Sequence, residues 1–146
     1  MYTVEKEIRW EMGHRLSRHD GKCFNIHGHS YNAAIVFGSD KLDASGMVID
    51  FYHFAKIKEY IDNNWDHALM LNIDDPVRDV LKDAKVTRKL KMWIAEGEPT
   101  AENIAKWLCV QSSMLLSNVA PDGVQILSVT VYETATSSAT YIPEAE

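Results

Sequence analysis

The sequence predicts an α+β fold in which strands come first, helices follow, and strands return near the C-terminus. Two N-terminal segments are rich in strand-forming residues, two central segments carry apolar residues at helical spacing, and a β-rich segment lies beyond them. Helices with an apolar stripe need a sheet to cover. This order favours antiparallel hairpins over alternating βαβ units. At 146 residues, we expect a single domain spanning residues 1–146.

The first two strands are expected at Thr3–Glu11 and His29–Gly38. The earlier segment alternates crudely between polar and apolar residues, and the later one is rich in strand formers and closes on a glycine. The connection Ser17–Asn25 is polar and contains Gly21, which is typical of a loop.

Two helices are expected in the middle of the chain. The first covers about Phe51–Asn64, with Asp50 as its N-cap, and its apolar stripe is interpreted as core packing. The second begins after Pro99, where the Thr100 side chain can accept a hydrogen bond from the first turn. The apolar residues on its buried face are Ile104, Trp107, Leu108 and Leu115.

Strands are expected again at Val124–Thr134 and, as a short segment, at Ala139–Ile142. Residues 78–98 give the least clear pattern. Within them, Val80–Lys91 is charged and is interpreted as an irregular excursion, and a short strand is expected at Leu90–Ala95.

Composition limits the classes of function. Apolar residues make up 46% and charged residues 25% of the chain, which is typical of a soluble globular protein. The apolar runs are shorter than the roughly 20 residues of a membrane-spanning helix, and no export signal follows Met1, so we expect a cytoplasmic protein with reduced cysteines. A formal net charge of −6 argues against a nucleic-acid partner.

Three histidines carry the strongest functional signal. His27 and His29 flank Gly28, and an extended segment projects such a pair from one face about 6.6 Å apart. Gly28 has no side chain that would crowd the rings. With His14, they supply the three ligands of a catalytic zinc site, which leaves one position open for water or substrate.

Cys23 is compatible with two roles. It is either a fourth ligand that closes a structural zinc site or a reactive thiol beside an open one, and the spacing does not separate these alternatives. Asp66 and His67 follow the first helix. A carboxylate-oriented imidazole can draw a proton from a thiol, although the same dipeptide is also an ordinary polar helix terminus.

Two further features have both an ordinary and a functional interpretation. Glu133 follows Val129 and Val131 on one face of its strand, either as a solvated strand end or as a carboxylate that accepts two N–H donors from a 2-amino-4-oxo pyrimidine ring. Basic residues near the histidines form either a solvated loop or a cradle for an anionic substrate. They are Arg15, Arg18, His19 and Lys22.

Taken together, these residues resemble the 6-pyruvoyl-tetrahydropterin synthase and 6-carboxy-tetrahydropterin synthase family. Motifs in the family's order span nearly the whole chain, and the short gap between Cys23 and His27 looks like the bacterial 6-carboxy branch. The motifs are Gly13-His14-Arg15-Leu16, Cys23 with His27-Gly28-His29-Ser30-Tyr31, Gly46-Met47-Val48-Ile49-Asp50-Phe51, Asp66-His67, Pro99-Thr100-Ala101-Glu102-Asn103 and Val131-Tyr132-Glu133-Thr134.

The resemblance implies a tunnelling fold, with a four-stranded antiparallel sheet and two helices on one face. It also implies an oligomeric β-barrel, either a trimer or a dimer of trimers, with active sites between subunits. Departures from the family occur at Trp10-Glu11-Met12-Gly13, where relatives commonly have phenylalanine and small residues, and at residues 78–98, which are longer and more charged than expected.

The resemblance further implies a role for each candidate residue. Zinc (Zn²⁺) is bound by His14, His27 and His29. Cys23 is the general base, and Asp66 and His67 complete its triad. Glu133 anchors a pterin ring with help near Thr100. Proximity to the histidines, and not the resemblance, makes Arg15, Arg18 and Lys22 candidate contacts for triphosphate, although Arg15 also lies within the family's His-Arg-Leu motif.

The implied activity is conversion of 7,8-dihydroneopterin triphosphate to 6-carboxy-5,6,7,8-tetrahydropterin, a precursor of 7-deazaguanine and queuosine, with release of acetaldehyde and triphosphate. The alternatives are a pyruvoyl-forming or sepiapterin-cleaving activity at the same site and, in another class, a non-catalytic module with a structural zinc.

Overall fold

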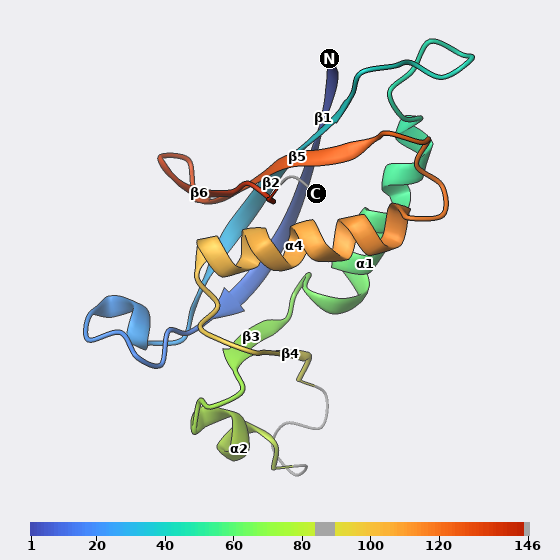
Figure 1. Ribbon diagram of the computed structural model, residues 1–146. Coiled ribbons are helices and arrows are strands. Elements are labelled where there is room, and N and C mark those ends of the chain that lie inside the picture. The colour runs from blue at the N-terminus through green and yellow to red at the C-terminus, as the bar shows by residue number, and fades with distance from the viewer. Residues whose placement is uncertain (84–89, 145–146) are drawn as a thin grey trace.

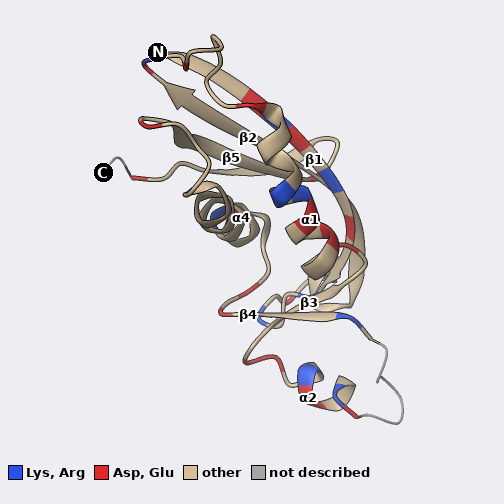
Figure 2. Ribbon diagram, turned by 90° about the vertical axis from the view of Figure 1, so that its right-hand side faces the viewer, with Lys and Arg blue, Asp and Glu red and all other residues tan. Residues whose placement is uncertain are grey.

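The computed structural model describes residues 1–83 and 90–144, and one curled sheet organises them. Figure 1 shows the long strands with α1 and α4 packed on one side, and Figure 2 shows the sheet curving around these two helices. The strand order is β4-β3-β1-β2-β5-β6 in a six-stranded sheet. The strands are β1 (Tyr2–His14), β2 (His27–Ser39), β3 (Leu69–Asn72), β4 (Met92–Ala95), β5 (Gln125–Thr134) and β6 (Ser137–Tyr141).

The sheet is mixed, and here the expectation of four antiparallel strands needs a correction. The strands β1, β2, β5 and β6 are antiparallel as predicted, but β3 pairs parallel with the end of β1, and β4 pairs parallel with β3. The Leu69–Asn72 segment was missed because its four residues are all buried, so it lacks the alternation that reveals a half-exposed strand.

A capping side chain stands at the start of each of the two helical segments. Asp50 accepts a hydrogen bond from the Tyr52 N–H, as predicted for an N-cap, but the first turn is the 3₁₀ helix η2 (Phe51–Phe54), and α1 spans Ala55–Asn64. The Thr100 hydroxyl accepts from the Asn103 N–H and caps α4 (Ala101–Leu116), which confirms the second predicted start.

The charged region between the helices contains two short elements. The predicted strand at Leu90–Ala95 is confirmed as β4, and the short helix α2 (Val77–Leu81) precedes it. Part of the expected excursion Val80–Lys91 falls on residues 84–89, outside the described residues. With β3 and β4, α2 lies at the end of the sheet away from the N-terminus (Figures 1 and 2).

The core lies between the sheet and the two long helices. Alternate residues of β1 and β2 face α1 and α4, and each fully buried aliphatic side chain contributes about 1.5–3 kcal/mol. The central ring contact is Trp10 stacked on Tyr31, with centroids 5.3 Å apart. On β1, the inward-facing row Ile8, Trp10 and Met12 ends at His14, so the core periodicity delivers a histidine to the buried face.

One finding concerns membranes. Within residues 1–83 and 90–144, no helix combines the length and the apolar character that crossing a lipid bilayer requires.

Candidate metal centre

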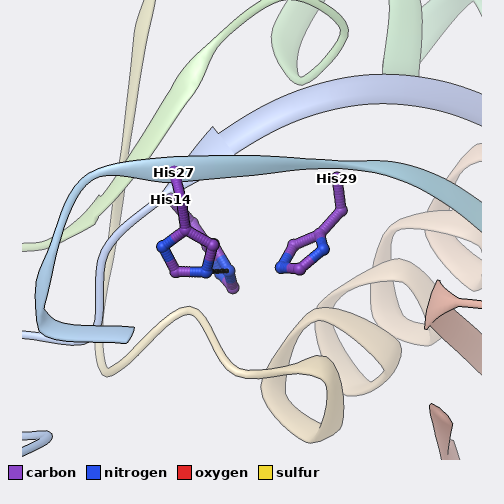
Figure 3. Close-up of side chains that lie close together, drawn as sticks. All are labelled: His14, His27 and His29. Carbon is purple, nitrogen blue, oxygen red and sulfur yellow. Dashed lines mark hydrogen bonds between the residues drawn. The ribbon is translucent and has the colours of Figure 1, made fainter. Parts of the chain in front are cut away.

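Three imidazoles meet where β1 ends and β2 begins. In the antiparallel register His14 pairs with His27, and His29 lies two residues farther along β2, so all three rings share the helix-covered face. Their candidate ligand atoms lie within 4.8 Å of one another, and the ring centroids are 4.6–5.1 Å apart. Figure 3 shows His27 over His14, with His29 turned toward them. The structure thus brings together the three histidines selected from the sequence.

Backbone carbonyls fix the orientation of two of these rings. The Nδ1–H of His14 donates to the Pro99 carbonyl oxygen at 2.7 Å, and the Nδ1–H of His27 donates to the Asn25 carbonyl oxygen at 2.7 Å. A neutral imidazole protonated at Nδ1 has an unprotonated Nε2. Both rings therefore present a lone pair, in the outer-shell arrangement typical of metal-binding histidines.

The distance between those two nitrogens fits a shared cation. Nε2 of His14 and Nε2 of His27 are 3.1 Å apart, joined by the dashed line in Figure 3. With both protons on Nδ1, neither nitrogen has a proton to donate to the other. Two nitrogens bound at 2.0–2.1 Å to one tetrahedral zinc stand about 3.3 Å apart, so the observed spacing suits metal binding.

Burial keeps His14 in the form that a metal requires. Desolvation lowers the pKa of His14 from 6.5 to about 4, opposed by its hydrogen bond to Pro99 and aided by the positive charges of His27 and His29. The ring is therefore neutral at pH 7 and has a lone pair available. Tyr31 Oη lies 3.2 Å from His14 Nδ1, and burial raises the pKa of this phenol well above its usual range.

Glu133 forms one side of the cluster. Val129 and Val131, which were predicted to share its face of β5, are buried, and Glu133 coincides with an irregularity in the β5–β6 register. Its Oε1 lies 3.9 Å from His14 Nε2, and its side chain is 26% exposed. A carboxylate thus stands beside the three imidazoles and remains accessible from solvent.

Cys23 lies in the loop between β1 and β2, in the 3₁₀ turn η1 (Lys22–Phe24). Its thiol is free and half-buried, and its carbonyl accepts from the Leu16 N–H at 2.9 Å. The negative charge of a Cys23 thiolate contributes to the raised pKa of Tyr31. Among the described residues, only the three histidines form a candidate metal cluster, and Cys23 is outside it. This arrangement favours an open metal site over a closed Cys-His₃ site.

Asp66 and His67 form an oriented pair just before β3. His67 Nδ1 lies 2.7 Å from Asp66 Oδ2, and Asp66 Oδ1 accepts from the Glu11 N–H at 2.9 Å. Although burial raises the pKa of Asp66, its hydrogen bonds with Glu11 and His67 lower it below the ordinary value. His67 has φ of 57°, in the left-handed region, and its N–H donates to the Glu11 carbonyl. The dipeptide is therefore more than a polar helix terminus.

The His67 side chain is open to solvent within one chain. The His67 side chain is 76% exposed and lines a hollow of about 380 Å³ with Glu11 and Ser30. Glu11 and Ser30 point away from the helices, because they alternate with Met12 and His29. In the part of the chain that the structure describes, no hydrogen bond links His67 to Cys23. Of the contacts expected for the triad, the described residues of one chain show the Asp66–His67 pair, and the link from His67 to Cys23 stays a prediction.

Arg15 and Thr100 already have protein partners. Arg15 Nε lies 3.0 Å from Asp75 Oδ2, and its guanidinium carbon lies 4.1 Å above the Phe24 ring. The Thr100 hydroxyl caps α4. Their roles toward a substrate therefore stay predictions. Sequence reasoning missed Asp75 entirely, and it missed the contact of Tyr31 with His14, which the two-residue spacing from His29 could have indicated.

Comparison with known proteins decides the family. The model of the 6-pyruvoyl tetrahydropterin synthase family matches residues 3–144. The chain belongs to this family. Among family relatives, an Aquifex aeolicus protein named 6-carboxy-5,6,7,8-tetrahydropterin synthase is 32% identical over 98% of this chain and 99% of its own length.

Solved structures agree with this placement in the 6-pyruvoyl tetrahydropterin synthase family. An uncharacterised protein from Wolinella succinogenes superposes with a TM-score of 0.82 at 26% identity, covering 98% of each chain. The 6-pyruvoyl tetrahydropterin synthase of Caenorhabditis elegans superposes with a TM-score of 0.68 at 25% identity, covering 98% of this chain and 96% of its own. The family fold is thus present over nearly the whole chain.

Proposed function

We propose that this chain is a zinc-dependent lyase that converts 7,8-dihydroneopterin triphosphate to 6-carboxy-5,6,7,8-tetrahydropterin, releasing acetaldehyde and triphosphate. The observation that carries the proposal is the convergence of His14, His27 and His29, whose candidate ligand atoms lie within 4.8 Å of one another. The near full-length similarity to the Aquifex aeolicus protein of that name supports the choice of product. In this proposal, the product feeds 7-deazaguanine and queuosine synthesis.

Zinc is the proposed metal because three neutral nitrogen ligands with one open position make a typical catalytic zinc site. When bound, zinc acts as a Lewis acid that polarises a substrate oxygen and makes the neighbouring carbon acid easier to deprotonate. The carbonyls of Pro99 and Asn25 hold two of the imidazoles in the tautomer that this requires.

Cys23 is the proposed general base. Its thiol is free and half-buried, and it is close enough to affect Tyr31 electrostatically. A thiol with the ordinary pKa of about 8.5 is mostly protonated at pH 7, so a nearby cation and an oriented imidazole are needed to produce the thiolate. A well-placed base of this kind contributes roughly 10²–10⁴-fold to the rate.

Glu133 is proposed to hold the pterin ring. Two carboxylate oxygens match two N–H donors on the edge of a 2-amino-4-oxo pyrimidine ring, and this charge-assisted pair fixes the orientation of the ring. The position of Glu133 beside His14 supports this role, because the side chain of the bound pterin would then extend toward the metal ligands. Thr100 lies at the start of α4, next to the Pro99 carbonyl that holds His14.

The active form is proposed to be a trimer or a dimer of trimers, each subunit one tunnelling-fold domain within an oligomeric barrel. The exposed His67, oriented by Asp66 and facing away from the helices, supports this assembly. A neighbouring subunit would bring its Asp66–His67 pair to Cys23 and complete the triad. A lone subunit is then expected to be inactive.

Product analysis tests the function. Purified protein loaded with zinc is incubated with dihydroneopterin triphosphate, the pterin is identified by mass, and acetaldehyde is assayed with an NADH-linked alcohol dehydrogenase. We expect 6-carboxytetrahydropterin together with acetaldehyde. If the protein holds zinc and the substrate remains unchanged, the proposed function is wrong. A 6-pyruvoyl product without acetaldehyde would support the second candidate, which the family description and the Caenorhabditis elegans likeness favour.

A Cys23→Ala variant separates catalysis from a structural zinc role. If Cys23 is the base, zinc content stays at the wild-type level and turnover disappears. If Cys23 is a fourth ligand of a structural site, the variant releases zinc and loses folded structure. Zinc content by atomic absorption and secondary structure by circular dichroism give the two readings.

A further inference from the structure

A buried ion pair lies next to the Cys23 loop. Arg15 follows directly after β1, and its Nε lies 3.0 Å from Oδ2 of Asp75, whose side chain is fully buried. The Arg15 side chain is only 12% exposed. The N–H is not aligned for a hydrogen bond, so the contact is an electrostatic one between two desolvated charges. Such a pair is costly to bury, and it calls for a reason beyond stability.

The same guanidinium supports the turn that carries the thiol. The guanidinium carbon of Arg15 lies 4.1 Å above the Phe24 ring, and Phe24 directly follows Cys23 in η1. One residue after Arg15, the Leu16 N–H donates to the Cys23 carbonyl at 2.9 Å. Two consecutive residues therefore support the Cys23 turn, Arg15 through the Phe24 ring and Leu16 through the Cys23 carbonyl. A displacement of Arg15 would change both contacts.

Asp75 fixes Arg15 from a rigid part of the fold. Asp75 Oδ1 accepts from the Val77 N–H at 2.9 Å, and its own N–H donates to the carbonyl of Asn72, the last residue of β3. Because β3 pairs with β1 beside His14, the carboxylate is anchored to the strand that carries a metal ligand. The geometry of the ion pair is thus tied to the metal centre.

A second link connects the same elements. Ser17 Oγ and Asn72 Nδ2 both donate to Oε1 of Glu98, and Glu98 precedes Pro99, whose carbonyl holds His14. Burial alone raises the pKa of Glu98, but these hydrogen bonds lower it below its ordinary value and keep the carboxylate ionised. The loop that carries Cys23 and the ring of His14 therefore share one supporting frame.

We propose that Asp75 and Arg15 are positioning residues that set the place of the Cys23 thiol relative to the histidine cluster, with Phe24 as the contact that transmits the position. This inference rests on the proposed function only in taking Cys23 as the reacting thiol. The buried charge pair serves alignment, because a misplacement of about 1 Å can cost about 100-fold in rate.

The first test measures the thiol itself. In a Cys109→Ala background, the rate of Cys23 alkylation by iodoacetamide at pH 7 is compared between the parent protein and Asp75→Asn, both loaded with zinc. We expect alkylation to slow about tenfold in Asp75→Asn, because the thiol moves away from the cation that favours the thiolate. Asp74→Asn is the matched control, since it removes an adjacent acidic residue whose pair with Arg18 is exposed. This control should alkylate at the parent rate.

The second test separates positioning from general loss of structure. In steady-state turnover of dihydroneopterin triphosphate, Asp75→Asn should lower kcat about 100-fold, with KM within about threefold and zinc content unchanged. Phe24→Leu keeps an apolar side chain but loses the ring face and should show the same pattern, whereas Phe24→Tyr keeps the ring and should retain activity. Arg15→Lys keeps the charge without the planar group and should resemble Phe24→Leu.

Three results would overturn the positioning role: parent-like alkylation and kcat in both Asp75→Asn and Phe24→Leu, equal losses in Asp74→Asn and Asp75→Asn, or loss of zinc in Asp75→Asn. If Asp75→Asn does not fold, Arg15→Lys and the two Phe24 variants decide the question. If the parent enzyme does not turn over the substrate, the proposed function fails, and the alkylation comparison still judges the positioning role by itself.

Discussion

The histidine cluster and the Asp66–His67 pair differ in completeness. The cluster lies on the helix-covered face of β1 and β2, whereas the pair precedes β3 and borders a hollow with Glu11 and Ser30, whose side chains point to the other face. The cluster has an inner ligand that is 1% exposed, backbone carbonyls that orient two rings, and a carboxylate at its side. His67 is 76% exposed and is held by one carboxylate. The difference indicates that one chain brings together all three candidate metal ligands but holds only part of the proposed proton-transfer machinery.

Physical chemistry explains why the two regions are built differently. A metal ligand must be neutral at working pH, and burial achieves this for His14 by lowering its pKa to about 4. A group that serves a thiol on another subunit must reach out from the surface. His67 is held in a left-handed backbone conformation between Asp66 and the carbonyl of Glu11, which fixes an exposed side chain before any partner arrives.

The largest expected effect comes from removing one imidazole on each face. His29→Ala should weaken zinc binding more than about 100-fold, which is the upper cost of losing an outer-shell partner alone, and abolish turnover. His67→Ala should keep zinc at the parent level and lower kcat roughly 10²–10⁴-fold. Zinc content after dialysis and initial rates measure both. Equal zinc loss in His29→Ala and His67→Ala would contradict the assignment of metal binding to the histidine cluster alone.

Mixing inactive variants tests whether the two halves come from different subunits. Cys23→Ala and His67→Ala are each expected to be inactive, but co-refolded in equal amounts they should regain about a quarter of the parent activity, because a heterologous interface pairs the intact residues at random. Mixing Cys23→Ala with the double variant Cys23→Ala/His67→Ala is the control and should stay inactive. Absence of rescue in oligomers shown to be mixed by mass would place both residues in one subunit's site.

Acid should destabilise the metal-free protein through the buried face. Folded His14 has a pKa near 4, lowered from 6.5, so the unfolded chain binds the extra proton first as the pH falls. The stability present above pH 6.5 is therefore lost progressively toward pH 4, by up to about 3 kcal/mol. Urea unfolding of chelator-treated protein at pH 7 and pH 4.5 measures the loss. It should persist in His67→Ala and shrink in His14→Asn; the reverse pattern would contradict this assignment.

The smallest effect concerns the backbone at the exposed pair. At a φ of 57°, a Cβ is disfavoured by about 1 kcal/mol, so His67→Gly should be more stable than His67→Ala by about that amount. Both variants lose the imidazole, which makes them a matched pair. Thermal or urea unfolding gives the difference. If the alanine variant is as stable as the glycine variant, the backbone at this position is not strained.

Much of the fold follows from local patterns. Crude alternation marked β1, enrichment in strand-forming residues marked β2 and β5, and helical spacing with capping residues marked α1 and α4. Strand β3 was not predicted, because a short, fully buried segment shows no alternation of polar and apolar residues. The H-x-H motif and a third histidine predicted a histidine cluster that could hold a metal, and the structure shows that cluster. The buried Arg15–Asp75 pair could not be predicted, because its partners are far apart in sequence and form no motif.

The sequence by itself determined which chemical groups the chain carries and which of them share a face of a strand, because side-chain alternation is a local property of extended backbone. His27 and His29 on one side, and Glu133 after two buried valines, are results of this kind. Only the tertiary structure decided that His14 pairs with His27 and that the His67 side chain, held by Asp66, stays exposed. Those relations depend on strand register and loop closure, which are set by packing between residues distant along the chain.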